Sequence, residues 1–266
     1  MRTAAAFGSS RSHELPASTP ARGRVDRRAA LAALASLLAC GAARAQDDPA
    51  AARAAMIERI EEHARDAEAA LGRTAIDPRV LEVMRRLPRH EFVPPQLAAG
   101  AYADRPLPIG HGQTISQPFI VALMTDMLRT APEQVVLEVG TGSGYQAAVL
   151  AELVRTVHSI EIITPLADAA EQRLRAQGHA NVTVHRGDGY YGVPDAAPFD
   201  GIMVTAAAGS IPPPLLDQLR PGARMVIPVG TAFMLQYLML VEKAPDGTIT
   251  TRQTLPVAFV PLVRGG

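Results

Sequence analysis

Residues 135–154 read VVLEVGTGSGYQAAVLAELV, and this stretch decides the expected fold. A short apolar run ends at Val139, glycines follow at positions 140, 142 and 144, and a helix-like segment begins at Tyr145. Glycine adopts positive backbone angles without strain, so the chain can turn sharply here and lie close against a ligand. A strand that passes through a glycine loop into a helix is typical of nucleotide-binding α/β proteins, although any tight strand–helix turn could use the same residues.

The alternation of strand-like and helix-like segments continues to the C-terminus. The strand-like segments are 156–162, 181–189, 199–207, 223–229, 236–243 and 248–257, and the helix-like segments are 145–154, 165–178 and 213–219. Strands that alternate with helices predict an α/β fold with a mostly parallel, doubly wound sheet. The Asp246-Gly247 turn between the last two strands predicts a terminal antiparallel hairpin.

The section before this alternation reads as a small helical appendage. Met56, Ile57 and Ile60 recur at helical spacing in an Ala-, Glu- and Arg-rich stretch from 47 to about 71. Asp77-Pro78 is typical of a helix start, and it predicts a second short helix over 79–87. We therefore divide the chain into a leader or disordered extension (1–46), a helical appendage (47–105) and a main domain (106–266).

The first 46 residues follow the order of a secretory leader. Arginines 24, 27 and 28 precede an apolar run from Ala29 to Ala39, and Ala43-Arg44-Ala45 offers a cleavage site. The apolar run is too short to span a bilayer, so we expect no stable membrane association. The alternatives are a disordered extension or a start codon placed too early.

Composition excludes several classes of function. The net charge is zero, which gives no reason to expect a nucleic-acid partner. Cys40 is the single cysteine, which rules out a disulfide framework and cysteine-rich metal sites. We expect no metal, and the sequence leaves the oligomeric state open.

Three acids stand near the ends of successive predicted strands, at Glu138, Glu161 and Asp188. Glu138 would repel a pyrophosphate but attract the ammonium of an amino-acid cofactor such as S-adenosylmethionine, and the G-x-G-x-G spacing also differs from that of dinucleotide sites. Glu161 could accept ribose hydroxyls, and Asp188 with Gly189 could bind a flat base. Taken singly, each acid could instead be a solvated carboxylate or part of a turn.

Residues 107–128, LPIGHGQTISQPFIVALMTDML, carry the most specific pattern in the chain. With VLEVGTGSGY, GDG, PFDGIMVTAAA and IPPPLLDQLRPGARMVIPVG, in that order, they resemble the protein-L-isoaspartate O-methyltransferases. The resemblance implies a class I S-adenosylmethionine-dependent methyltransferase fold over 106–266. It also implies methyl transfer to the α-carboxylate of L-isoaspartyl residues in damaged proteins and peptides, which initiates their repair.

The resemblance also assigns site residues. Ser116 takes the position of the active-site serine, with Thr114 and Ile115 in the same loop. The other residues that it places around the cofactor are Glu138, Gly140, Gly142, Gly144, Glu161, Asp188, Gly189 and Gln236. Family members often have aspartate at the position of Glu138, and they typically lack a leader. Because the methyl donor is made inside the cell, we expect a cytoplasmic enzyme, with a periplasmic form beginning near Gln46 as the alternative.

The polar loop before Pro118 could bind an anion. Pro118 fits the first position of a helix to about Leu128, with Phe119, Leu123 and Met127 on one face. A loop at the positive end of a helix favours an anion, so Ser116 and nearby amides could orient the substrate carboxylate. The alternative is that Ser116 only caps the helix.

Without the resemblance, the residues leave three other functions open. They are a dehydrogenase of the same topology, a methyltransferase acting on another small molecule or macromolecule, and an exported binding protein without turnover.

Overall fold

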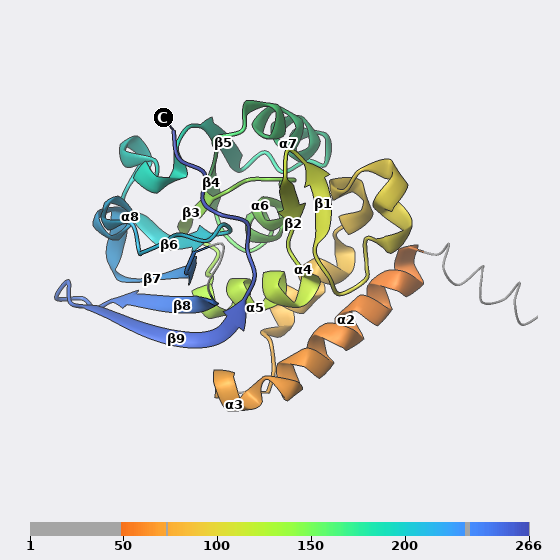
Figure 1. Cartoon of the computed structure of the whole chain (residues 1–266), viewed down its shortest axis with the longest axis horizontal. Helices are drawn as coiled ribbons and strands as arrows, with labels where there is room; N and C mark the ends of the chain where they lie inside the picture. The colour runs from red at the N-terminus through yellow and green to blue at the C-terminus, as the bar shows by residue number, and fades with distance from the viewer. Residues whose placement is uncertain (1–48, 73, 232–234, 266) are drawn as a thin grey trace, which may run out of the picture. The chain divides into compact units, whose positions relative to one another are not determined.

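The computed structural model describes residues 49–72, 74–231 and 235–265. The predicted leader lies outside the described residues. A seven-stranded sheet with the order β5-β4-β3-β6-β7-β8-β9 forms the centre (Figure 1). Its strands are β3 (Val135–Val139), β4 (Thr156–Glu161), β5 (Val182–Arg186), β6 (Phe199–Val204), β7 (Leu219–Val229), β8 (Gln236–Lys243) and β9 (Ile249–Val257).

The strand directions confirm the predicted fold. β3, β4, β5, β6 and β7 pair in parallel, whereas β8 pairs antiparallel with both β7 and β9. The turn between β8 and β9 contains Gly247 with a φ of 87°, which glycine adopts without strain. Strand order reverses between β3 and β6, and in open α/β sheets ligands bind beside such a reversal, at the carboxyl ends of the strands.

Helices cover both faces of the sheet. α5 (Pro118–Leu128), α6 (Tyr145–Ala151) and α7 (Thr164–Ala176) pack into one hydrophobic cluster with side chains from β3 to β7. The opposite face buries a second cluster, to which α8 (Pro213–Gln218) contributes Leu215. Within β3, β6 and β7, neighbouring side chains point to opposite clusters, as the two-residue period of a strand requires.

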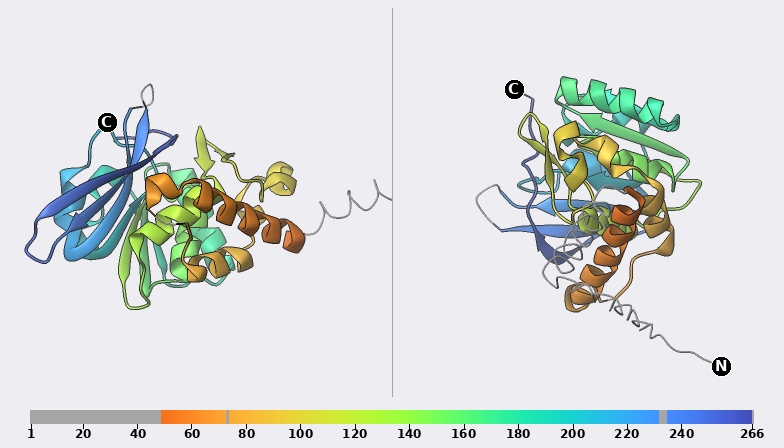
Figure 2. Two further views of the ribbon diagram at one scale, coloured as in Figure 1. Left: turned by 90° about the horizontal axis from the view of Figure 1, so that it is seen from below. Right: turned by 90° about the vertical axis from the view of Figure 1, so that its right-hand side faces the viewer.

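Two N-terminal helices lie against the outer side of α5. They are α2 (Pro49–Asp66) and α4 (Pro78–Arg86), which Figure 2 shows beside α5, whereas the short α3 (Glu68–Leu71) contacts β9. Met56, Ile60 and Met84 join the same hydrophobic cluster as α5. α5 is therefore buried on almost every side rather than on the single predicted face, since only Ile120 among its residues is not fully buried.

A small hairpin precedes α5 and was not predicted. β1 (Leu107–Gly110) and β2 (Gln113–Ile115) pair antiparallel, and His111 and Gly112 at their turn have positive φ values of 52° and 70°. Two such residues form the type of turn that suits a hairpin. The polar stretch noted in the sequence is thus a hairpin tip and strand, and it places Ser116 at the junction of β2 and α5.

Two short 3-10 helices, η1 (Arg89–Phe92) and η2 (Pro95–Gly100), link α4 to the hairpin. No helix among the described residues is long and apolar enough to cross a membrane.

Candidate active site

The glycine loop joins β3 to α6 at the point where the strand order reverses. Gly140, Gly142 and Gly144 have φ values of 98°, 53° and 87°, so each position needs glycine for its backbone conformation. A Cβ at Gly140 would lie 2.5 Å from Thr205 Oγ1, because the Thr205 hydroxyl donates to the carbonyl of Gly140 at 2.6 Å. Thr205, directly after β6, thus fixes the first turn of the loop.

Glu161 ends β4 and holds the loop from the other side. Its Oε2 accepts from Gly142 N at 2.9 Å, and its Oε1 accepts from Ile163 N at 2.9 Å. A carboxylate oxygen has a further lone pair, so both oxygens can still accept a ligand hydroxyl. Glu161 lines two small cavities beside the loop, which agrees with a position near the predicted ribose.

Glu138 lies behind the glycine loop and is fully buried. Ser159 Oγ donates to Glu138 Oε2, and Thr141 Oγ1 lies 2.6 Å from the same Ser159 hydroxyl. Within the described residues, Glu138 Oε1 has no hydrogen-bond partner. Burial raises the pKa of the Glu138 carboxyl to about 8, so this group is mostly protonated at neutral pH. The structure thus places Glu138 behind the glycine loop, where burial favours the neutral carboxyl, whereas the sequence suggested a carboxylate that attracts the ammonium of the cofactor.

Asp188 and Gly189 follow β5. A Cβ at Gly189 would lie 2.5 Å from Val139 Cγ1, so only glycine lets this backbone pack against the end of β3. Asp188 Oδ1 accepts from Tyr190 N, and Oδ2 accepts from Gly265 N and Arg264 Nε, both at 3.0 Å. Burial alone would raise the pKa of Asp188, but the hydrogen bonds from Tyr190 and Gly265 and the contact with Arg264 hold it below its ordinary value. The acid predicted to bind the base is therefore ionised and already contacted by the C-terminal segment.

The C-terminal segment crosses this edge of the sheet. Ala207 N donates to Val260 O and Leu262 N donates to Ala207 O, both at 2.8 Å, and Figure 1 shows the deep-blue chain running from β9 past β6. At its end, the Arg264 guanidinium lies 3.6 Å from the centre of the Tyr190 ring. We call residues 258–265 the C-terminal strap. The two cavities beneath it and beside the glycine loop measure only about 50 and 40 Å³.

Gln236 begins β8 and anchors the strap. Its Nε2 donates to Phe259 O at 3.1 Å, while Phe259 N donates to its Oε1 at 2.6 Å. The side-chain amide of Gln236 is thus paired with the backbone N–H and C=O of Phe259. Gln236 lines neither of the two small cavities. Its contacts give it an indirect place at the site, through the strap that it holds, instead of the direct cofactor contact implied by the resemblance.

The hairpin side of the site contains Thr114, Ile115 and Ser116. Ile115 is buried and lines the 50 Å³ cavity, whereas Thr114 and Ser116 line both that cavity and a larger one of about 610 Å³. Gln117 is the N-cap residue of α5 and makes no side-chain cap hydrogen bond, so Ser116 is not the cap. In the part of the chain that the structure describes, Ser116 Oγ donates to no acceptor.

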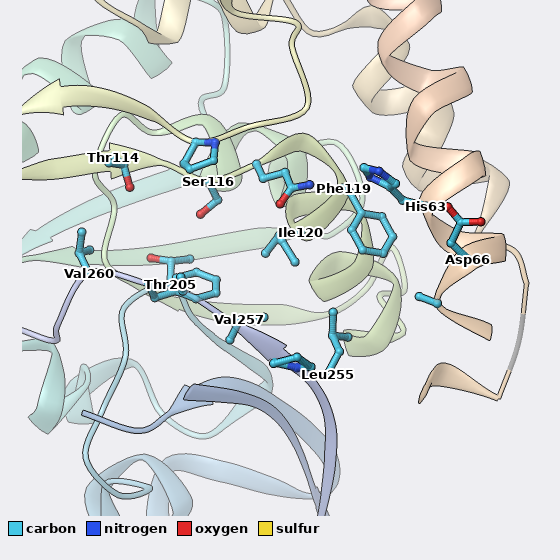
Figure 3. Close-up of a pocket in the computed structure, with 16 residues that line it drawn as sticks. His63, Asp66, Thr114, Ser116, Phe119, Ile120, Thr205, Leu255, Val257 and Val260 are labelled. Atoms are coloured by element: carbon cyan, nitrogen blue, oxygen red, sulfur yellow. The ribbon is translucent and has the colours of Figure 1, made fainter. Parts of the chain in front are cut away.

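The larger cavity leads away from the glycine loop. Figure 3 shows Thr114, Ser116, Thr205 and Val260 at one end and His63 and Asp66 of α2 at the other. Phe119 and Ile120 from α5 form one wall, and Leu255 and Val257 from β9 form the opposite wall (Figure 3). This substrate-sized cavity meets the small loop-side cavity at Thr114, Ser116, Thr205 and Val260, which line both.

A buried aspartate closes the positive end of α5. Asp104 Oδ1 accepts from Phe119 N at 2.8 Å, and its Oδ2 accepts from Gln117 Nε2 at 2.8 Å and lies 2.5 Å from His63 Nδ1. The expectation that the amides of this helix end are free for a substrate is thus corrected at Phe119, whose N–H already binds an internal carboxylate. Pro118 has no N–H, so among the described residues the N–H groups of Gln117 and Ile120 remain without an acceptor at this end.

Sequence reasoning missed several residues of the site. Arg89 and Asp104 lie in segments without a periodic pattern, and a fully buried arginine is contrary to the usual distribution of charged residues. Thr205 falls at the end of a predicted strand, but no pattern marks its hydroxyl as a partner of the glycine loop. In the described residues, no group of three or more histidine, cysteine, aspartate or glutamate side chains could hold a metal ion.

Comparison with known proteins gives one consistent family. The sequence pattern of the family described as protein-L-isoaspartate(D-aspartate) O-methyltransferase matches residues 56–266. A protein-L-isoaspartate O-methyltransferase 2 from Syntrophobacter fumaroxidans is 64% identical over 233 residues, covering 87% of this chain and 94% of that relative. A protein-L-isoaspartate O-methyltransferase 1 from Cupriavidus necator is 58% identical over 233 residues, covering 88% and 90%.

Solved structures agree. A protein-L-isoaspartate O-methyltransferase matches with a TM-score of 0.68 at 27% identity, over 80% of this chain and 66% of that one. A Plasmodium falciparum protein of the same type, in complex with S-adenosyl-L-homocysteine, gives a TM-score of 0.66 at 22% identity over 79% and 98%. At that identity, the second likeness shows the shared fold.

Proposed function

The chain belongs to the protein-L-isoaspartate(D-aspartate) O-methyltransferase family, and on that premise we propose how its residues carry out the reaction. The enzyme transfers a methyl group from S-adenosylmethionine to the α-carboxylate of L-isoaspartyl residues in damaged proteins. The observation that carries this function is the junction at Ser116, where the cavity of about 610 Å³ meets the small cavity beside the glycine loop, which we call the cleft.

The residues of the cleft fit the cofactor. Glycine at positions 140 and 189 lets the backbone pack tightly against Thr205 and Val139 at the edge of the cleft, and Glu161 presents both carboxylate oxygens at a strand end. Glu138 Oε1, which has no partner among the described residues, is a free polar atom behind the loop. When bound, S-adenosylmethionine supplies a methyl group activated on a sulfonium. Ligand pockets generally measure about 300–1,000 Å³, so the C-terminal strap has to move outward for the cofactor to enter.

The acceptor needs little chemical activation. An aspartyl carboxyl has an ordinary pKa of about 3.9, so it is already an anion at neutral pH. Holding two reactants in line can by itself contribute about 7–11 kcal/mol. We therefore assign no general base. Catalysis depends instead on the groups that orient the carboxylate toward the cleft.

Ser116 is the proposed orienting group. Its hydroxyl faces both cavities and, in the described part of the chain, has no acceptor of its own, so it can donate to a carboxylate oxygen. Thr114 lies two residues earlier in β2 and lines the same two cavities, on the same face of the strand.

The larger cavity is the proposed site for the substrate chain. Its apolar walls at Phe119, Ile120, Leu255 and Val257 suit side chains next to the isoaspartyl residue, and Asp66 adds a negative charge at the far end. A cavity open at the surface between a helix and an edge strand can accept an extended peptide of many sequences, which suits an enzyme that acts on damaged proteins in general.

The test compares two peptides that differ only in one linkage. Purified full-length protein should methylate an isoaspartyl peptide with radiolabelled S-adenosylmethionine and leave its aspartyl twin unmodified. Equal labelling of both peptides, or of neither, would refute the substrate. Methylation of a small molecule or an RNA with no transfer to the isoaspartyl peptide would instead support the rival methyltransferase.

For the location, we propose the cytoplasm. The donor is a charged metabolite made inside the cell, and an exported enzyme would exhaust a single bound molecule after one turnover. Cell fractionation with N-terminal sequencing checks this. A periplasmic chain that begins near Gln46 would overturn it.

A further inference from the structure

Arg89 is a buried cation next to the active-site loop. It lies in η1, its side chain is 0% exposed, and Nε donates to Ala101 O at 2.7 Å. Nη2 donates to Ser116 O at 2.7 Å. Arg89 thus reaches from the protein interior to the backbone of the residue whose hydroxyl faces the cavity.

Burying a guanidinium is costly, so its contacts have to be strong for the fold to keep it. Burial lowers the pKa of Arg89 to about 10, which still leaves it protonated at neutral pH. No carboxylate of the described residues forms an ion pair with it, although its guanidinium carbon lies 5.0 Å from the centre of the Tyr145 ring. Two charge-assisted hydrogen bonds to carbonyls are therefore its main attachments.

The bond to Ser116 O sets the orientation of a peptide group. The Ser116–Gln117 bond is trans, and in a planar trans peptide the C=O and N–H point in opposite directions. Because the carbonyl of Ser116 points inward at Arg89, the N–H of Gln117 points the other way. Ser116 and Gln117 both line the 610 Å³ cavity, and Arg89 does not.

The Gln117 N–H is one of two backbone donors left without an acceptor at the start of α5, among the described residues, and the other, of Ile120, lies a turn further on. Asp104 accepts the Phe119 N–H, and Pro118 has none. Across the described ranges, the Gln117 N–H has no acceptor, and neither has the adjacent Ser116 hydroxyl. The two donors belong to consecutive residues beside one cavity, so a single carboxylate could accept from both.

We infer that Arg89 is a positioning residue for the methyl-accepting carboxylate. By holding the Ser116 carbonyl from inside, it directs the Gln117 N–H at the cavity, where this N–H and the Ser116 hydroxyl bind the carboxylate together. The inference rests on the proposed function and adds to it a second donor and the group that aims it.

One pair of variants isolates the N–H. Gln117 has φ −51° and ψ 135°, and proline takes φ of about −65 ± 15°, so Gln117→Pro removes the N–H from a backbone that is already suitable. Gln117→Ala keeps the N–H, and like the proline variant it loses the side-chain bond to Asp104. The alanine variant is therefore the matched control.

A second pair tests Arg89. Arg89→Met removes both bonds, and Arg89→Lys retains a cation that can reach one carbonyl. Phe92→Leu is the control for stability, since Phe92 is a buried residue of the same 3-10 helix and its ring packs against Tyr145.

The readout is the preference for a carboxylate. Dissociation constants are measured by calorimetry for an isoaspartyl peptide and its isoasparaginyl counterpart, whose carboxamide has the same shape, with S-adenosylhomocysteine bound. Losing a hydrogen bond to a charged group changes binding by about ten-fold or more. We expect Gln117→Pro and Arg89→Met to lose about that much of the wild-type preference, and KM for the isoaspartyl peptide to rise in step. Arg89→Lys should retain part of it, and Phe92→Leu should keep all of it. Gln117→Pro should lose about ten-fold more of it than Gln117→Ala, because only the proline variant lacks the N–H.

Two further results complete the test. The double variant Arg89→Met/Gln117→Pro should lose no more than either single variant, because both changes remove the same donor. S-adenosylhomocysteine affinity should be unchanged throughout. A wild-type preference in Gln117→Pro overturns the inference even if Arg89→Met fails to fold. A wild-type enzyme that methylates no isoaspartyl peptide would instead refute the proposed function.

Discussion

Arg264 Nε lies 3.0 Å from Asp188 Oδ2, so the end of the chain occupies the hydrogen-bonding position predicted for the base of the cofactor. The same guanidinium stacks on the Tyr190 ring at 3.6 Å. The predicted role of Asp188 therefore requires an incoming adenine to displace the side chain of Arg264.

Arg264→Ala should strengthen cofactor binding. Arg264 is half exposed, and solvent screens an exposed ion pair so that it contributes little, so we expect at most about a five-fold lower Kd for S-adenosylhomocysteine by calorimetry. Arg252→Ala, at an exposed position of β9, is the control and should change nothing. A weaker complex in the Arg264 variant would mean that the strap residue holds the ligand and does not compete with it.

Glu138→Gln should stabilise the cofactor-free protein at alkaline pH. Burial raises the pKa of Glu138 from 4.5 to about 8, so between these values the folded protein holds a proton that the unfolded chain has lost. Stability from this group is full below pH 4.5 and is lost as the pH rises through about 8. Because glutamine does not ionise, the advantage of the variant should grow from pH 5 to pH 8.5 by on the order of a few kcal/mol.

Urea unfolding of both proteins at the two pH values measures this difference. Comparing variant with wild type at each pH cancels the titration of other groups. A constant difference between the two proteins across the range would show that Glu138 ionises as easily when folded as when unfolded.

Gly189→Ala should damage both stability and cofactor binding. The new Cβ would lie 2.5 Å from Val139 Cγ1 in the buried end of β3, so the strand or the loop has to shift. Overpacking of this kind costs about 1–3 kcal/mol. Gly209→Ala is the control, since a Cβ there meets nothing within 4 Å. Thermal unfolding and S-adenosylhomocysteine titration measure both effects. If the Gly189 and Gly209 variants have equal melting temperatures and equal affinities, the tight packing of Gly189 against Val139 does not matter for either.

Gln236→Ala should loosen the strap without touching the cleft. It leaves the N–H and the C=O of Phe259 without their amide partner. We expect faster hydrogen exchange in residues 258–263 and faster dissociation of S-adenosylhomocysteine. Thr254→Val, which removes a bond between β9 and β8, controls for a general loss of sheet stability. Unchanged exchange in the strap would show that the bridges from Ala207 hold it alone.

The sheet could be predicted because its signals are local. Each strand between Val135 and Val257 is a run of apolar or alternating residues, and glycines 140, 142 and 144 mark a turn that only they allow. The β1–β2 hairpin was missed because four- and three-residue strands are too short to show a period. α5 was expected to be amphipathic, since nothing in its own sequence reveals that α2 and α4 cover its outer side.

The site was harder to predict, because its contacts join distant segments. The link from Arg89 to Ser116 spans 27 residues, and the link from Arg264 to Asp188 spans 76. Neither pair has a spacing that periodicity could detect. The indirect position of Gln236 arises in the same way, because its partner Phe259 lies 23 residues away in the strap.

Ser116→Ala should reduce methyl transfer far more than cofactor binding. The hydroxyl is proposed to donate to the substrate carboxylate, and losing a hydrogen bond to a charged group costs about 1.5–3 kcal/mol, roughly a ten- to hundred-fold loss of kcat/KM. The small change leaves the backbone, and with it the bond from Arg89 to Ser116 O, in place. Ser210→Ala, at an exposed position after β6, is the matched control. Steady-state kinetics on an isoaspartyl peptide measure methyl transfer, and S-adenosylhomocysteine titration measures cofactor binding. If Ser116→Ala turns over as fast as wild type, the Gln117 N–H and the cavity walls orient the carboxylate without the hydroxyl, and Ser116 has no catalytic role.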